Sequence, residues 1–291
     1  MKAAFFSGCV IPVKYPGIEA ATRYLAGELG IGLVDIEFGC CPAPTGLKSI
    51  HFDSWLTLAS RNLFLAEEKG LDIVTLCSGC TNTLREAGHI LAGDEEKREL
   101  VKRLLAKHGK AHEGKVKVVN LVEILARDEF LDLMEAKRVR SLDGIKYGTH
   151  YGCHYFRPGD VMQDGEPDPR FPLPESMELI LEALGAQVIP FGRQDMCCGA
   201  ALSLNTGRNE EALEITKEKL FWMNDAGIEA LAVPCPTCLN QFDMGQVMLK
   251  RAEKTENIFP VYHIAELVAY ALGADPQILN LSSHKVPAAI F

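Results

Sequence analysis

The feature that most constrains this chain is the arrangement of its cysteines. Its 291 residues contain ten cysteines, in two sets of five that follow the same order. In each set a single cysteine comes first, an adjacent pair follows, and a C-x-x-C motif closes the set. The sets are Cys9, Cys40, Cys41, Cys77 and Cys80, and then Cys153, Cys197, Cys198, Cys235 and Cys238. Two similarly ordered sets of thiols indicate a duplicated fold with a metal site in each half.

Composition favours a globular protein from a reducing compartment. The chain is 47% hydrophobic and 24% charged, and it is long enough for two ordinary domains. Its net charge of −9 argues against a nucleic-acid partner, because such binding relies on basic surface. We see no apolar run of the roughly 18 residues that a bilayer-spanning helix needs, and no signal peptide. We therefore expect a cytoplasmic protein without a membrane span, in which a disulfide framework is disfavoured.

Short apolar runs alternate with amphipathic stretches in both halves, and the first three runs of each half lead toward cysteines. The predicted strands cover residues 2–7, 31–38, 71–76 and 117–119, and then residues 145–151, 187–191 and 228–233. Alternation of strands and helices at this spacing predicts parallel sheets with helical crossovers. We therefore predict an α/β fold of two homologous, Rossmann-like halves with mainly parallel sheets, related by internal duplication. The two domains are expected at residues 1–140 and 141–291.

This placement brings the five thiols of each half together. Ligands of an open parallel sheet gather at the carboxyl ends of its strands, where the cysteines are predicted to lie. Thiolates select iron–sulfur clusters or zinc, and unmetallated catalytic thiols are a third alternative. A cubane cluster or a tetrahedral zinc needs only four ligands. Because adjacent cysteines suit the bridging of irons in a more open cluster, we favour an iron–sulfur cluster in each half over zinc with a spare thiol.

The full pattern resembles the duplicated CCG domain, and over essentially its whole length the chain is similar to the family of heterodisulfide reductase B subunits of methanogenic archaea. The resemblance implies two non-cubane 4Fe–4S clusters, each held by one of the five-cysteine sets. It also implies an oxidoreductase that reduces the mixed disulfide of coenzyme M and coenzyme B, bound between the clusters, to two thiols. That reaction is the last energy-conserving step of methanogenesis. One departure from the motif is Pro42, where the second copy has Gly199.

The resemblance further implies partner subunits. Electrons would arrive through the iron–sulfur C subunit and the A subunit, which has flavin and iron–sulfur groups, coupled to a hydrogenase or formate dehydrogenase in an electron-bifurcating complex. CCG domains also occur in electron-transfer subunits of succinate, lactate and glycerol-3-phosphate dehydrogenase systems, which is the alternative interpretation. The chain keeps both cysteine sets and has no ferredoxin-like cysteine motif, which favours the reductase.

Four residues other than cysteine are candidates for the site. His154, directly after Cys153, is a candidate proton source or substrate contact, or else a histidine that orients the loop. Lys14, Lys48 and Arg193 flank the cysteines and are candidates for binding the anionic groups of the coenzymes, or else ordinary solvated charges. Aromatic residues within 150–155 are candidates for packing against the coenzyme B tail.

Overall fold

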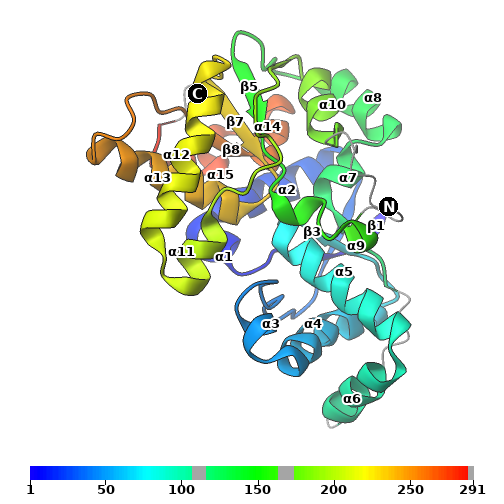
Figure 1. The fold of residues 1–291 in the computed structure, drawn as a ribbon. Helices are drawn as coiled ribbons and strands as arrows, with labels where there is room; N and C mark the ends of the chain where they lie inside the picture. The colour runs from blue at the N-terminus through cyan, green and yellow to red at the C-terminus, as the bar shows by residue number, and fades with distance from the viewer. Residues whose placement is uncertain (107–115, 163–173, 288–291) are drawn as a thin grey trace. The chain divides into compact units, whose positions relative to one another are not determined.

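The computed structural model of the chain describes residues 1–106, 116–162 and 174–287 (Figure 1). These residues contain two four-stranded parallel sheets, with strand orders β2-β1-β3-β4 and β6-β5-β7-β8. The strands are β1 (Lys2–Phe6), β2 (Gly32–Asp35), β3 (Ile73–Thr75), β4 (Val118–Asn120), β5 (Lys146–Thr149), β6 (Gln187–Val188), β7 (Ala230–Val233) and β8 (Val261–His263). Because the second four strands repeat the order of the first four, the predicted duplicated α/β fold is confirmed.

The first compact unit is built on the sheet β2-β1-β3-β4. Its helices are α3 (Leu47–Ile50), α4 (Phe52–Glu67), α5 (Ser78–Gly93), α6 (Glu95–Leu105) and α9 (Gly159–Met162). A single helix is predicted over residues 49–69, but the structure divides it at His51. The His51 Nδ1 atom accepts a hydrogen bond from the Ser54 amide at 3.2 Å, so His51 caps the start of α4 and ends α3.

The second compact unit is built on the sheet β6-β5-β7-β8. Its helices are α1 (Val10–Lys14), α2 (Pro16–Glu28), α8 (Asp128–Lys137), α10 (Ser176–Ala183), α11 (Ala200–Thr206), α12 (Asn209–Asp225), α13 (Pro236–Arg251), α14 (Ile264–Ala271) and α15 (Pro276–Leu279). The short helix α7 (Leu121–Leu125) begins at the boundary between the two units, and 3₁₀ turns cover Cys153–Tyr155 and Leu281–Ser283.

Each compact unit takes a segment from the other half of the sequence. Val10–Gly30 belongs to the second unit, where α2 packs on α14. There the Tyr24 hydroxyl donates a hydrogen bond to the Leu272 carbonyl at 3.2 Å. In return, the described part of the segment that begins at His154 belongs to the first unit, where α9 packs on α5. The predicted division at residues 140 and 141 therefore stays a prediction about the sequence repeat rather than about the packed units.

The topology of each sheet creates one favoured place for a ligand. In the first sheet β1 pairs with β2 on one side and with β3 on the other, so the chain connections change direction at β1. The carboxyl end at such a switch point is where open α/β sheets bind ligands. The second sheet repeats this arrangement around β5. The sequence also predicts a proline-rich loop at about 157–174 and a solvated helix with its exit loop at 94–115. Most of the first and the end of the second lie outside the described residues.

Candidate metal centres

The first cysteine set gathers beyond the carboxyl ends of the strands in the first unit. Cys77 follows β3 in an extended conformation and caps α5, and Cys80 lies in the first turn of that helix. The Cys80 Sγ lies 3.1 Å from the Cys41 Sγ, although the two residues are 39 apart in the chain. Cys41, Cys77 and Cys80 are buried, whereas Cys9 and Cys40 are exposed. The first set therefore has three buried thiols and two that are exposed to solvent.

The second cysteine set repeats this arrangement in the second unit. Cys235 follows β7 and caps α13, and Cys238 lies in the first turn of that helix. The Cys198 Sγ lies 3.4 Å from the Cys238 Sγ, which is the contact between the same two members of the set as in the first unit. The Cys153 Sγ lies 4.0 Å from the Cys197 Sγ. Cys198, Cys235 and Cys238 are buried, and the other two are half-buried.

The sulfur separations suit ligands of a shared metal group. All ten cysteines are free thiols, and a disulfide would bring two sulfurs to about 2.05 Å. Two thiolates on one tetrahedral metal, with metal–sulfur bonds of about 2.3 Å, lie about 3.8 Å apart. The observed contacts of 3.1, 3.4 and 4.0 Å lie on either side of that value. The residues present in each set therefore fit a metal ion or an iron–sulfur group.

The thiols of each set differ in pKa. Hydrogen bonds from Cys40 and Cys80 hold the pKa of the Cys41 thiol well below its ordinary value, and the same contact with Cys41 raises the pKa of Cys80. In the second set, hydrogen bonds from Cys153, from Cys198 and from a backbone amide lower the pKa of Cys197 to about 2. Each set thus contains one sulfur that favours the thiolate, which is the form that binds metal.

Two glycines let the backbone pass close to the buried sulfurs. Gly8 and Gly152 precede the first cysteine of each set and have left-handed φ values of 73° and 79°. A Cβ atom on Gly8 would lie 3.3 Å from the Cys80 Sγ, and one on Gly152 would lie 3.1 Å from the Cys238 Sγ. Both distances are shorter than the roughly 3.5–4.0 Å of a comfortable carbon contact. Only glycine combines this φ value with this proximity.

The two loops that carry the adjacent cysteines differ at the residue after the pair. Gly199 adopts a left-handed φ of 97°, and a Cβ atom there would lie 2.5 Å from the Ala212 carbonyl oxygen. Proline cannot adopt that φ value. In the first set the Pro42 carbonyl instead accepts a hydrogen bond from the Thr83 hydroxyl at 3.1 Å. The departure from the motif therefore changes the path of the loop, while all five thiols remain in the set.

A side chain from the second helix after each cysteine pair holds the loop in place, but its chemistry differs between the units. Asn62 on α4 accepts from the Gly39 amide at 2.9 Å and donates to the Cys40 carbonyl at 3.0 Å. Lys219 on α12 is fully buried, and its ammonium donates to the carbonyls of three loop residues, Arg193, Gln194 and Met196, at 2.8–3.1 Å. Burial lowers the pKa of Lys219 to about 8. Asn62 and Lys219 each precede a Leu-Phe dipeptide seven residues before a glycine, so they are equivalent positions of the repeat.

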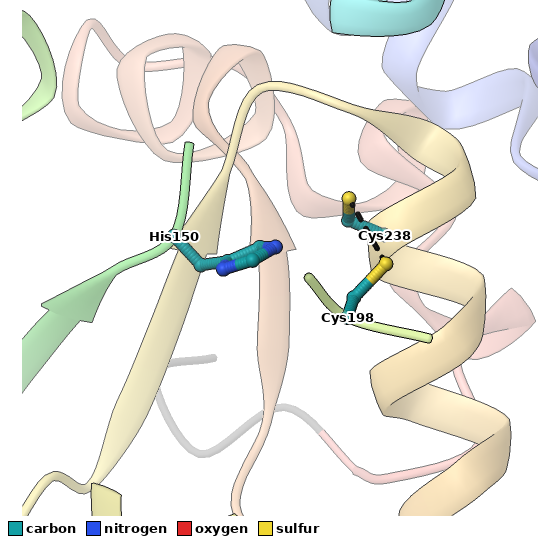
Figure 2. A group of neighbouring side chains, drawn as sticks. All are labelled: His150, Cys198 and Cys238. Atoms are coloured by element: carbon teal, nitrogen blue, oxygen red, sulfur yellow. Dashed lines mark hydrogen bonds between the residues drawn. The ribbon is translucent and has the colours of Figure 1, made fainter. Parts of the chain in front are cut away.

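The structure places at the second site one residue that sequence reasoning named only within the aromatic stretch 150–155 and not as a neighbour of the thiols. His150 follows β5, and one of its ring nitrogens lies with the sulfurs of Cys198 and Cys238 in a group whose atoms are all within 4.8 Å of one another. Figure 2 shows the ring pointing toward the two sulfurs. The equivalent position of the first half is Phe6, two residues before Gly8. That difference between the repeats is the one sequence signal that could have identified His150.

Two of the predicted non-cysteine residues are linked to the second cysteine set. His154 is the neighbour of Cys153 in the chain, and Lys14 makes a hydrogen bond to a residue near Cys238. His154 is half-buried and sits beside Cys153 in the 3₁₀ turn. Lys14 is exposed, and its Nζ donates to the Asn240 Oδ1 at 2.9 Å, two residues beyond Cys238. Both roles stay predictions.

Lys48 and Arg193 occupy different surroundings. The Lys48 ammonium pairs with the Glu86 carboxylate and lies 5.1 Å from the centre of the Trp55 ring, so its charge is largely compensated. Arg193 is exposed and has a left-handed φ of 59° in the loop before the second pair. Their roles in binding anionic groups also stay predictions. Within the described part of the chain, no helix has both the length and the apolar character needed to cross a membrane.

Comparisons with known proteins agree with this geometry. A family model described as a cysteine-rich domain (CCG) matches residues 3–85 and 147–243. The chain is 34% identical to the B subunit of the ferredoxin/F(420)H(2)-dependent CoB-CoM heterodisulfide reductase of Methanosarcina acetivorans, over 98% of this chain and 94% of that protein. It is 30% identical to the 8-methylmenaquinol:fumarate reductase membrane anchor subunit of Wolinella succinogenes, over 98% of this chain and 97% of that protein.

A solved structure confirms the fold alone. The crystal structure of a hypothetical protein from Helicobacter pylori superposes with a TM-score of 0.78 at 16% identity, covering all of this chain and 53% of that one. The two matched ranges of the family model each contain one full cysteine set. The chain therefore belongs to the cysteine-rich CCG-domain family, in its two-copy form, and to the group within it that includes the heterodisulfide reductase B subunits.

Proposed function

We propose that each cysteine set holds an iron–sulfur cluster of the non-cubane 4Fe–4S type and that the chain is an oxidoreductase subunit. The observation that carries this proposal is the repeated five-thiol site, with the same sulfur contact at 3.1 Å in one unit and 3.4 Å in the other. A fifth thiol exceeds the requirement of a cubane or a zinc ion. The adjacent cysteines give each site two ligands from one loop, which suits a more open cluster.

We further propose that the substrate is the mixed disulfide of coenzyme M and coenzyme B. The support is the similarity to heterodisulfide reductase B subunits over almost the whole chain. Reduction of a disulfide breaks one S–S bond, consumes two electrons and two protons, and releases two thiols. An iron–sulfur cluster, when bound, supplies one-electron redox chemistry, so two sites match the two electrons.

The chain's own residues would supply the remaining requirements. His154 is placed beside Cys153 and would hold a proton for a product thiolate or contact the substrate. Lys14 and Arg193 are exposed positive groups that would attract the anionic coenzymes. Electrons must come from partners, which by similarity would be the iron–sulfur C subunit and the flavin-containing A subunit, supplied by a hydrogenase or formate dehydrogenase.

Metal analysis of anaerobically purified protein tests the first part of the proposal. Two four-iron clusters predict about eight irons and eight labile sulfides per chain. Cys77→Ser and Cys235→Ser, each measured against the other, should each lose about half of the iron, because the two residues belong to different sites. Stoichiometric zinc with little iron would contradict the cluster assignment.

A single-turnover reaction tests the substrate. Chemically reduced protein is mixed anaerobically with the coenzyme M–coenzyme B disulfide, and both released thiols are quantified. The proposal predicts release of coenzyme M and coenzyme B in equal amounts. Homodisulfides of each coenzyme are the control for unspecific reduction by cluster iron.

One observation favours a second candidate function, that of an electron-transfer subunit of another enzyme. The fumarate reductase relative is aligned over nearly as much of the chain as the reductase relative. A relay subunit would take up and release electrons but would leave the heterodisulfide intact. Intact clusters with no thiol release in the single-turnover experiment would therefore favour this second function.

A further inference from the structure

His150 is a buried histidine whose ring has no hydrogen-bond partner among the described residues. The residue has no exposed surface, and neither Nδ1 nor Nε2 makes a hydrogen bond. Its backbone amide is satisfied by the Ala232 carbonyl at 3.0 Å, which fixes the residue at the end of β5. Because buried polar groups of native proteins are almost always hydrogen-bonded, the unsatisfied ring indicates a partner other than the protein groups that the structure describes.

The surroundings of the ring show where that partner lies. One face of the site is apolar, since the Phe242 ring packs edge-on against the imidazole with the ring centres 5.0 Å apart. The other side holds the sulfurs of Cys198 and Cys238 (Figure 2). A Cβ atom on Gly152 would lie 3.9 Å from the His150 Nε2 and 3.1 Å from the Cys238 Sγ, so Nε2 is the nitrogen on the sulfur side.

The ring is suited to donate one hydrogen bond. An imidazole carries an N–H on at least one ring nitrogen whether it is neutral or protonated, so His150 has a hydrogen atom to donate. Second-sphere N–H groups that donate to cluster sulfurs are one of the means by which a protein sets the potential of such a group.

We propose that the His150 Nε2–H donates a hydrogen bond to a sulfur of the metal group held by Cys198 and Cys238, and that this contact distinguishes the second site from the first. The inference rests on the proposed iron–sulfur function. A hydrogen bond is favoured over a metal–nitrogen bond because the first site has the same five thiols with Phe6 in the place of His150. The cysteine set is thus complete without a nitrogen ligand.

The contact has a measurable electronic consequence. A hydrogen bond to sulfur stabilises the reduced, more negative state of a cluster, so it raises the reduction potential. The variant His150→Phe places the residue of the first half at the second site and is expected to shift the reduction potential of one cluster to a more negative value, while the other cluster keeps its potential. The variant His150→Gln retains an N–H donor and is expected to restore part of the shift.

Anaerobic redox titration followed by electron paramagnetic resonance, with protein labelled with ¹⁵N-histidine, tests the proposal. We expect a weak ¹⁵N coupling to one cluster in the unmodified protein, lost in His150→Phe. An unchanged potential with no ¹⁵N coupling would overturn the proposal, and a coupling strong enough for a metal–nitrogen bond would overturn the hydrogen-bond assignment. Failure of the proposed function is distinguishable, because it would leave no cluster signal to titrate.

If His150→Phe does not fold or does not retain its cluster, the unmodified labelled protein and His150→Gln still decide the question. Because His154 lies beside Cys153 in the same site, the ¹⁵N coupling of the unmodified protein is assigned to His150 by its loss in labelled His150→Gln. The potential of His150→Gln relative to the unmodified protein then reports whether a different donor at this position changes the same cluster. Neither readout requires turnover of a substrate.

Discussion

Gly152→Ala should release the metal group of the second site with little effect on the stability of the metal-free fold. The substitution has two separable effects. An alanine at a left-handed φ of 79° lowers the free energy of unfolding by about 1–2 kcal/mol. The smaller conformational entropy of the unfolded chain raises it by about 0.4–1 kcal/mol. The net loss of about 1 kcal/mol corresponds to a fall in Tm of about 2–4 °C for a protein of this size.

The second effect is steric and depends on the metal. The new methyl group would lie 3.1 Å from the Cys238 Sγ, so the sulfur must move by a few tenths of an ångström. In the metal-free protein the thiol can rotate to relieve this contact. A bound metal fixes its ligand distances to within about 0.2 Å, so the same displacement weakens binding. We therefore expect the iron content to fall from about eight to about four per chain.

Gly227→Ala is the matched control. Gly227 has a left-handed φ of 73°, but a Cβ atom there would meet nothing within 4 Å. Its Tm should fall as far as that of Gly152→Ala, and its iron content should stay complete. Iron and sulfide analysis, combined with thermal unfolding of the metal-free proteins, measures both quantities. Equal iron in the two variants would refute the reasoning from the sulfur contact.

Two further predictions concern the loop around Cys40 and the buried pair formed by His284 and Glu266. Asn62→Ala removes both hydrogen bonds to the loop around Cys40. We expect urea unfolding to show a loss of about 1–3 kcal/mol in the free energy of unfolding, and iron analysis to show loss of iron from the first site. Full iron content with unchanged stability would contradict this prediction. Burial lowers the pKa of His284, but the charge and hydrogen bond of Glu266 outweigh this and raise the pKa above 6.5. Because a raised pKa contributes stability that is complete below the unfolded value and lost as pH rises through the folded value, the unfolding free energy should fall from pH 6 upward. Glu266→Gln should remove this fall, and an unchanged pH profile in the variant would show that the pair is not its cause.

The sequence contained enough information to place the thiols. Cys77 and Cys235 come at or just past the ends of predicted strands, and in the structure they follow β3 and β7 and precede α5 and α13. This worked because parallel strands end at the same edge of a sheet, so a position in the pattern predicts a position in space. The extent of β6 was less predictable. Its pairing covers only Gln187–Val188, and Pro190 follows, which has no backbone donor for a sheet.

Features that depend on tertiary packing could not be predicted. The apolar face of α2, with Ile18 and Leu25 buried, shows that the helix covers something but does not show which element it covers. In the structure that element is α14, in the unit of the second sheet. The place of His150 beside the sulfurs, and the burial of Lys219, were missed for a similar reason. A single histidine at a strand end, or a single lysine in a charged helix, has the same sequence pattern whether it is solvated or buried.

The equivalent positions of the repeat show how duplication produced two unequal sites. The thiols and the glycines that approach them are the same in both units, because any loss of a ligand or any side chain at those glycines would weaken binding. The groups around the thiols are different. Asn62 holds the first loop with a neutral amide, whereas Lys219, with a pKa of about 8, holds the second loop with an ammonium that is mostly protonated at neutral pH. A buried positive charge favours the more negative state of a nearby metal group. A ring nitrogen of His150 also lies within 4.8 Å of the sulfurs of Cys198 and Cys238. On the proposed function, the Lys219 ammonium and the His150 ring would both stabilise a reduced cluster in the second site, and the equivalent residues of the first half, Asn62 and Phe6, carry no such groups.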